Sequence, residues 1–238
     1  MANSMGLPDN GTLSKEDFLY AGRWISKAVD IPIICDADTG FDDIEKTVSN
    51  YIEAGFSGLH IEDQVFPKRC GHLSGKEVIG WEEMGAKIKI ACAVRDKLNP
   101  DFIIIGRTDA RGAKNIDEKN QFKESISRGA FYLQEGADMV FPESLQNQGE
   151  FAVYRKQVPG FLMANMTEFG KTPFIKIKEF EEMHYNLVIF PVSLFRYHAG
   201  QTRGFLSRLR ELGSQEELVP DMMNRSEINT FLNYEPES

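Results

Sequence analysis

The stretch "DFIIIGRTDARG", residues 101–112, decides the fold because it joins an apolar run directly to a cluster of charged side chains. The run is apolar throughout rather than alternating, which is typical of a parallel strand covered on both faces. Further runs of this kind lie at residues 31–36, 57–62, 137–143, 160–165 and 186–192. Helical periodicity between the runs predicts helices over residues 14–29, 42–55, 80–98, 117–136, 148–157, 175–185 and 193–212. Alternating strands and helices predict a parallel α/β sheet joined by crossovers.

Six predicted strands fit two architectures. A closed (β/α)8 barrel needs eight strands and about 250 residues, whereas an open doubly wound sheet is satisfied with six. No GxGxxG motif follows any predicted strand, so the dinucleotide-binding form of the open sheet lacks its phosphate loop. The 238 residues begin with a loop and a helix rather than a strand. For a barrel, this predicts that its first strands precede the sequence.

Composition restricts the class of protein. The formal net charge of −9 argues against nucleic acid as the main partner, because phosphate binding requires a basic surface. No run approaches the roughly 18 apolar residues of a membrane span, and residues 1–11 lack the pattern of a signal peptide. Three widely spaced cysteines form no CxxC pair. The sequence therefore predicts a cytoplasmic protein without disulfides, membrane spans or nucleic-acid ligands.

Each predicted strand runs into polar residues of the kind that perform chemistry. In a parallel barrel or sheet, the carboxyl ends of all strands meet at one face, and that face carries the active site. Any single strand must end in polar residues, but six in succession favour a site. The residues are Asp36, Asp38, Glu62, Asp63, Arg107, Asp109, Glu143, Asn165, Thr167, Glu168, Ser193 and Arg196.

Two of these acids suggest a metal site. Asp36 and Asp38 are two residues apart and point to the same side of an extended chain, so both can face one cation, with Glu62 joining from the next strand. Oxygen ligands favour Mg²⁺ or Mn²⁺; the alternative is a pair of solvated or capping acids before Gly40. Arginine forks fit carboxylates. The predicted substrate is therefore a small polyanion bridged to the metal and held by Arg107, Asn165, Thr167 and Arg196.

The segment "FPKRCGHLSGKEVI", residues 66–79, places Cys70 a few residues after a predicted strand, at the same face. Nearby basic side chains, Lys68, Arg69, Lys76 and a charged His72, are expected to lower the pKa of the Cys70 thiol. Gly71 and Gly75 allow the loop to move as a lid does. A Cys70–His72 nucleophile pair remains an alternative. Cys35 and Cys92, within a strand and a helix, are interpreted as buried apolar residues.

Long motifs resemble one known family, the isocitrate lyase and phosphoenolpyruvate mutase superfamily, and are most similar to its 2-methylisocitrate lyases. They are "CDADTGF", "GLHIEDQ", "PKRCGHLSGK", "GRTDARG", "GADMVFPE", "LMANMTEFGKTP" and "IFPVSLFR". The resemblance implies a single TIM-barrel domain over residues 1–238, here with about six of its strands. It also implies that residues 193–238 form a C-terminal helical segment swapped between subunits of a homo-oligomer, commonly a tetramer.

The same resemblance implies a carbon–carbon lyase that cleaves 2-methylisocitrate to pyruvate and succinate in propionate breakdown, with Mg²⁺ as the cofactor and Mn²⁺ as the other option. Cys70 then corresponds to the general acid, and the residues around the reacting centre are Glu62, Arg107 and Glu143. The implied substrate-binding residues are Asp9, Gly71, His72, Arg107, Asn165, Thr167 and Arg196. The implied metal-region acids are Asp36 and Asp38.

Three alternatives remain open from the sequence. The first is a sister enzyme on the same fold: a 2,3-dimethylmalate lyase, an oxaloacetate hydrolase, an isocitrate lyase or a phosphonate mutase. The second is a hydrolase that uses Cys70 and His72 as nucleophile and base. The third is a non-catalytic truncated copy that assembles through the helical segment near residues 193–234. Magnesium dependence and a substrate panel distinguish these alternatives.

Overall fold

The computed structural model describes residues 1–72 and 74–235. The chain divides into two compact units, residues 1–191 and 192–238. The first unit holds a six-stranded sheet with its helices, and the second unit is helical. In the described part of the chain, no helix is both long enough and apolar enough to cross a membrane.

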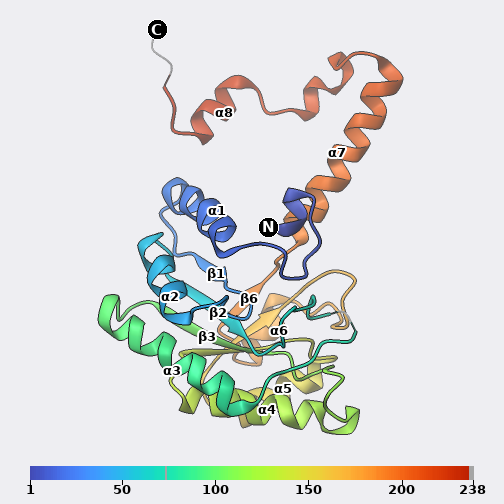
Figure 1. Cartoon of the computed structure of the whole chain (residues 1–238). Helices are drawn as coiled ribbons and strands as arrows, with labels where there is room; N and C mark the ends of the chain where they lie inside the picture. The colour runs from blue at the N-terminus through green and yellow to red at the C-terminus, as the bar shows by residue number, and fades with distance from the viewer. Residues whose placement is uncertain (73, 236–238) are drawn as a thin grey trace. The chain divides into compact units, whose positions relative to one another are not determined.

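The sheet is parallel, and each strand pairs with the next strand along the chain, in the order β1-β2-β3-β4-β5-β6 (Figure 1). The strands are β1 Ile34–Asp36, β2 Gly58–Glu62, β3 Ile103–Thr108, β4 Met139–Pro142, β5 Phe161–Asn165 and β6 Leu187–Ile189. A doubly wound sheet reverses its strand order at a switch point. This sheet has no reversal, so it is a half-barrel of βα units. The predicted barrel class and all six predicted strands are confirmed.

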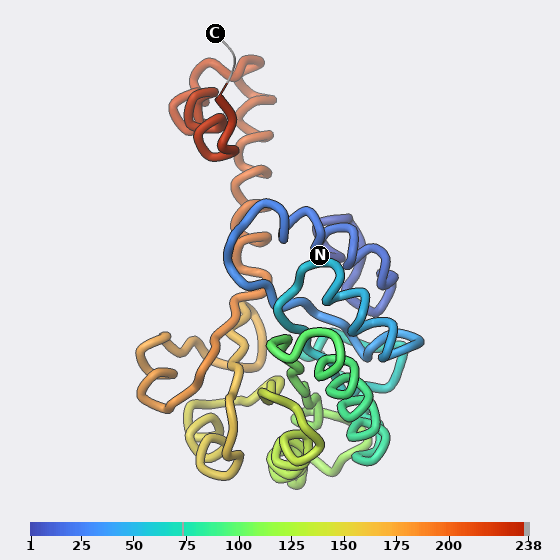
Figure 2. The backbone as a smooth tube through the Cα atoms, turned by 90° about the vertical axis from the view of Figure 1, so that its left-hand side faces the viewer, coloured from blue at the N-terminus to red at the C-terminus, as the bar shows by residue number. Residues whose placement is uncertain are grey.

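The helices of the first unit follow one another around the sheet, and the colour gradient of Figure 2 runs in the same order. They are α1 Lys15–Ala28, α2 Ile44–Glu53, α3 Trp81–Leu98, α4 Glu118–Gln134, α5 Gln148–Gln157 and α6 Ile177–Glu182. The second unit contains α7 Ser193–Leu212, the 3-10 helix η2 Glu216–Asp221 and α8 Arg225–Phe231. All seven predicted helices are present. The short η2, α8 and η1 (Ala2–Met5) were not predicted.

Local signals explain where the helices begin and end. Ser14, the predicted start of the first helix, accepts a hydrogen bond from the backbone N–H of Asp17, whose side chain accepts one from the Ser14 N–H in return. This capping box satisfies two of the four free N–H groups of the first turn. Helix α2 ends before Gly55, which adopts a φ of 87° that glycine tolerates without a Cβ penalty.

Two apolar layers hold the sheet. Ile104 and Val140 are fully buried in the large cluster between strands and helices. Their sequence neighbours Ile105 and Phe141 belong with Met163 to a smaller cluster. Because successive side chains of a strand point to opposite faces, the smaller cluster lies on the inner face of the half-barrel. Both faces are covered by apolar side chains, as the continuous apolar runs predict.

Candidate active site

The carboxyl ends of the central strands bring the predicted residues into register. Asp36 of β1 is the neighbour of His60 of β2, and Glu62 is the neighbour of Arg107 on β3. Glu143 follows directly after β4, and its N–H donates to the Thr108 carbonyl oxygen. The side chains after four consecutive strands therefore form one cluster, as expected for the carboxyl-end face of βα units.

The acids after β1 are held by a lysine that the sequence did not assign to the site. The Asp38 N–H donates to Oδ1 of Asp36 at 2.8 Å. The Lys68 ammonium lies 2.5 Å from Oδ1 of Asp38 and 2.8 Å from Oδ1 of Asp9. The predicted residues Asp9, Asp36 and Asp38 are thus brought together. Asp38 has a φ of 46°, and such strained backbone in a non-glycine residue is frequent at functional sites.

Environment separates the two aspartates. Burial alone would raise the pKa of Asp36, but the charges of His60, Lys68 and Arg107 outweigh it and lower the pKa to about 2. Burial and the negative charge of Asp36 raise the pKa of Asp38 to about 6. Asp36 is therefore a fully ionised carboxylate, and it lies beside Asp38, whose ionisation a further cation would complete.

Glu62 shows that the donor set fits a hydrated divalent cation. Both of its carboxylate oxygens are fully buried without a hydrogen-bond donor, although Arg107 Nη1 approaches one of them to 3.2 Å. Burial raises the pKa of Glu62 well above its usual range. Within residues 1–72 and 74–235, no three His, Cys, Asp or Glu side chains lie close enough to hold a metal by themselves. Mg²⁺ commonly uses one or two carboxylates and keeps several waters, and Asp36 and Asp38, with Glu62 accepting from water, fit that pattern.

The segment that carries Cys70 is fastened over the cluster by backbone and side-chain bonds. Gln64 donates to the Arg69 carbonyl oxygen and accepts from the Arg69 N–H. Ser144 Oγ donates to the Gly71 carbonyl oxygen at 2.9 Å. A Cβ on Gly71 would lie 2.5 Å from Glu143. The loop backbone therefore lies directly on the ends of β3 and β4, which only a glycine permits.

His72 is fixed by three neighbours. Its Nδ1 accepts from the Lys171 N–H at 3.1 Å, and its Nε2 lies 2.8 Å from Glu143 Oε1. Asn165 Nδ2 donates to the other Glu143 oxygen at 3.1 Å and lies 3.4 Å from His72 Nε2. Because Nδ1 accepts, Nε2 carries the hydrogen and donates to Glu143. The predicted residues His72, Glu143 and Asn165 thus form one hydrogen-bonded group.

The expected lowering of the Cys70 pKa is wrong. Burial raises the pKa of the Cys70 thiol, and the backbone N–H of His72 offsets this only in part. The basic side chains expected to lower it have other partners: Lys68 binds Asp9 and Asp38, and Lys76 binds Asp109. Cys70 is therefore a protonated thiol, which fits a proton donor and disfavours the nucleophile pair with His72.

The other two predicted substrate-binding residues are Thr167 and Arg196. Thr167 is buried in the turn after β5, two residues beyond Asn165. Arg196 lies in the first turn of α7, in the second unit. Cys92 is buried in α3, as interpreted from the sequence, whereas Cys35 in β1 is only half-buried.

Sequence reasoning missed the residues that support Arg107. Asp109 was noted only as a strand-end acid, Lys76 only as a charge near Cys70, and Asp63 was given no role. In the structure, all three are buried and carry ion pairs or hydrogen bonds among themselves and with Arg107. No local sequence signal marked them, since charged residues are almost never fully buried unless paired, and Asp63 and Lys76 lie far from Asp109 in the sequence.

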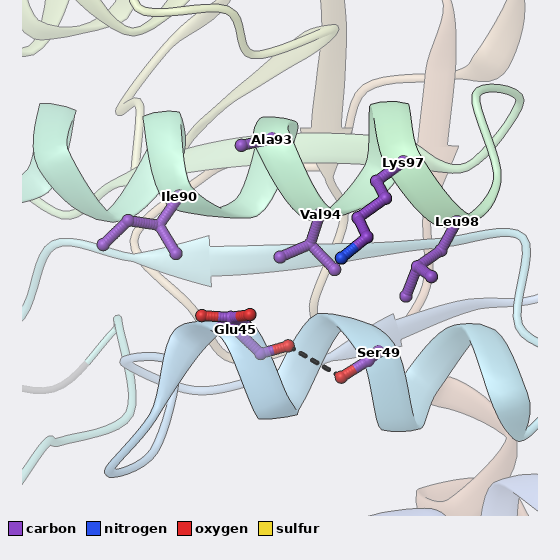
Figure 3. A pocket seen from close by; sticks show the side chains of 7 residues that line it. All are labelled: Glu45, Ser49, Ile90, Ala93, Val94, Lys97 and Leu98. Atoms are coloured by element: carbon purple, nitrogen blue, oxygen red, sulfur yellow. Dashed lines mark hydrogen bonds between the residues drawn. The ribbon is translucent and has the colours of Figure 1, made fainter.

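A surface pocket lies elsewhere, at the seam between α2 and α3 (Figure 3). Its walls are Ile90, Ala93, Val94, Lys97 and Leu98 from α3, with Glu45 and Ser49 from α2. Ser49 Oγ donates to the Glu45 carbonyl oxygen, a bond within one helix. None of the strand-end acids lines this pocket.

A half-barrel of βα units with an acid cluster, a buried arginine and a loop thiol at its carboxyl ends defines a TIM-barrel-like enzyme. A family model described as phosphoenolpyruvate phosphomutase matches residues 1–209. The chain belongs to this family of enzymes. Probable 2-methylisocitrate lyase 1 of Corynebacterium glutamicum is 40% identical over 239 residues, which cover 99% of this chain and 76% of that protein.

Solved structures agree with this assignment. The crystal structure of 2,3-dimethylmalate lyase, a member of the PEP mutase/isocitrate lyase superfamily, matches with a TM-score of 0.86 at 28% identity, covering 97% of this chain and 76% of that one. Phosphonopyruvate hydrolase in complex with oxalate and Mg²⁺ matches with a TM-score of 0.83 at 27% identity, covering 98% and 79%. The superfamily therefore includes enzymes whose structures hold Mg²⁺.

Proposed function

We propose that this protein is a carbon–carbon lyase that cleaves 2-methylisocitrate to pyruvate and succinate. The observation that carries the proposal is the Cys70 thiol, protonated by its burial, on a loop that contacts Arg107 and Glu143 through Gly71. A lyase of this kind needs an acid that protonates a carbanion after the bond breaks. The similarity to the C. glutamicum relative supports the choice of substrate.

In the proposed reaction, a base accepts the proton of the substrate hydroxyl, and the bond between the hydroxyl-bearing carbon and its neighbour breaks. The bonding electrons pass to the carbon that becomes part of succinate, and Cys70 donates its proton there. Arg107 and Glu143, with Glu62, surround the reacting centre. Asn165, Thr167 and Arg196 bind the succinate carboxylates, and Gly71, His72 and Asp9 complete the pocket on the loop side.

We assign Asp36 and Asp38 to hold Mg²⁺, with Mn²⁺ as a substitute, and Glu62 to accept hydrogen bonds from its water. A bound divalent cation would supply positive charge to the hydroxy acid part of the substrate. The donor chemistry of these side chains and the Mg²⁺ complex of a family member support this assignment. Lys68, which already lies between Asp9 and Asp38, would fix the two carboxylates in place.

The proposal extends to assembly and location. Helix α7 has no buried residue, and it exposes Leu194, Tyr197 and Leu206. Such an apolar helical surface supports a homo-oligomer, a tetramer in this proposal, joined through residues 193–238. We place the protein in the cytoplasm, within propionate catabolism by the methylcitrate cycle. Neither nucleic acid nor membrane is part of the proposal.

The proposed function is tested by pyruvate release from 2-methylisocitrate, followed with a coupled dehydrogenase, in the presence of Mg²⁺ and of EDTA. Turnover that requires Mg²⁺ supports the proposal. The test is run on this chain and on a form extended upstream, because the chain covers 76% of its C. glutamicum relative. Folded protein without turnover in both forms would overturn it.

A second candidate is 2,3-dimethylmalate lyase, supported by the structural match to that enzyme. The two substrates differ in a side-chain carboxylate, and a pocket that hydrogen-bonds a polar group rejects an analogue lacking it far more strongly than one lacking a methylene. Comparing kcat/KM for the two substrates decides between the candidates. A higher value for 2,3-dimethylmalate would replace the first assignment.

A further inference from the structure

Beneath Arg107 lies a buried ion network that the proposed reaction does not use. Arg107 donates from Nε to Oδ2 of Asp109 at 2.8 Å and from Nη2 to Oδ1 at 3.2 Å. The Lys76 ammonium donates to the same Oδ1 at 3.0 Å. Asp109 is 0% and Lys76 is 1% exposed. One carboxylate thus lies between two cations without access to water.

Asp109 is itself fixed from the opposite side. Its N–H donates to Oδ1 of Asp63 at 2.7 Å. Oδ2 of Asp63 accepts from the Tyr132 hydroxyl at 2.6 Å and from Arg128 Nη1 at 3.0 Å. Tyr132 and Arg128 both belong to α4. The network therefore ties the end of β3 to the outer helix layer.

We propose that Asp109 is a positioning residue that orients the Arg107 guanidinium, and that Lys76 offsets the carboxylate charge around this pair so that an anionic substrate can bind. The inference rests on the proposed function, in which Arg107 contacts the substrate. Asp63 supports this arrangement because its carboxylate accepts the hydrogen bond from the Asp109 backbone N–H.

The geometry explains why both partners are needed. Asp109 binds the Nε–Nη2 edge of the guanidinium as a fork, which fixes the plane of the group. Nη2 also faces the loop, since a Cβ on Gly71 would lie 2.6 Å from it. Nη2 therefore faces the Gly71 loop beside Glu143 while Asp109 holds it from below, and Nη1 lies 3.2 Å from Glu62 Oε2. A one-ångström displacement of such a group costs about 10²-fold in rate.

Charge explains the buried lysine. An Arg107–Asp109 pair alone is neutral and would attract a carboxylate only weakly. With Lys76, two cations offset the carboxylates of Asp109 and Glu143, so the lysine removes one unit of the negative charge that a bound anion would otherwise meet. In a buried site, where the effective dielectric constant is lower than that of water, this change acts more strongly on a bound anion than it would in bulk water. A lysine placed only for stability would leave substrate affinity unchanged when replaced by a neutral side chain of the same length.

The test is a double-mutant cycle with Arg107→Lys, Asp109→Asn and their combination. We expect Asp109→Asn to lower kcat/KM at least 30-fold in the wild-type background and less than threefold in the Arg107→Lys background. Such non-additivity is the signature of a residue that acts through another. Equal losses in both backgrounds would overturn the positioning role.

Lys76→Met is the second variant, and it keeps the length of the buried side chain. We expect the dissociation constant of succinate with Mg²⁺, measured by calorimetry, to rise at least tenfold while the circular dichroism spectrum stays unchanged. Unchanged succinate affinity in a folded Lys76→Met protein would overturn the charge role. This test measures succinate binding and therefore does not depend on turnover. A wild-type protein that fails to cleave 2-methylisocitrate would count against the proposed function but not against the role of Lys76.

The matched control is Asp138→Asn. Asp138 accepts from Arg95 Nη1 at 2.6 Å and from the Ile104 N–H at 2.8 Å, but it lies before β4, at the amino ends of the strands. Its replacement also breaks an arginine–carboxylate pair. We expect it to lower the melting temperature without changing succinate affinity or coupling to Arg107→Lys. If Asp138→Asn coupled to Arg107→Lys as strongly as Asp109→Asn does, the double-mutant cycle would report only a loss of stability, and the positioning role would be overturned.

Discussion

Gly71→Ala is the change that tests the closed loop most directly. The added Cβ would lie 2.5 Å from Cγ and 2.8 Å from Cδ of Glu143, and 2.6 Å from Nη2 of Arg107. Both side chains are buried and held by further bonds, Glu143 by His72 and Arg107 by Asp109, so neither can move aside. Ordinary contact begins near 3.4 Å, so the loop must retreat by about 0.9 Å.

A displacement of about 1 Å at a catalytic group costs about 10²-fold in rate. We therefore expect Gly71→Ala to lower kcat/KM for 2-methylisocitrate about 100-fold, measured by coupled pyruvate release. Trypsin should also cut faster after Lys68 or Arg69, because the loop leaves its bonds. Gly80→Ala is the matched control, since its Cβ would meet only Glu82 Oε2 at 3.7 Å. Near-normal turnover in Gly71→Ala, with unchanged proteolysis, would refute the closed-loop geometry.

Three further outcomes are expected. Cys70→Ser should lose most turnover yet bind succinate normally. The wild-type rate needs the protonated thiol, whose pKa is raised by burial, so this rate should fall only above pH 9.0. A fall at lower pH would contradict the assignment of Cys70 as general acid. Asp38→Ala, like EDTA, should abolish Mg²⁺-dependent substrate binding, as calorimetry would record. Ile104→Ala, in the fully buried core, should cost about 2–5 kcal/mol of unfolding free energy in urea, whereas exposed Ile90→Ala should cost within about 0.5 kcal/mol.

The arrangement of the elements could be predicted because it depends on short-range signals. Continuous apolar runs located all six strands, and the Ser14 cap located the start of α1. The carboxyl-end rule then placed Asp36, Glu62, Arg107 and Glu143 together without any knowledge of their contacts. Parallel strands in register make this inference reliable, since neighbouring strand ends must adjoin.

Partners of individual side chains could not be predicted in the same way. The four basic residues around Cys70 are close in sequence, which suggested a lowered thiol pKa. In the structure, Lys68 and Lys76 reach acids on other strands, and burial decides the thiol pKa instead. A long flexible side chain can turn to any carboxylate within its reach, so sequence proximity does not fix its partner. The choice is made by tertiary packing.

The balance of charge at the strand ends supports the proposal that this site takes a divalent cation. Five carboxyl groups meet three cations there: Asp36, Asp38, Glu62, Asp109 and Glu143 with Lys68, Lys76 and Arg107. Even with Glu62 protonated through its raised pKa, four carboxylates remain. A substrate with several carboxylates would be repelled by this excess of negative charge unless further positive charge entered with it. In the proposed function, Mg²⁺ held by Asp36 and Asp38 would supply part of that charge, and Arg107, supported by Lys76, would supply the rest beside Glu143 at the reacting centre.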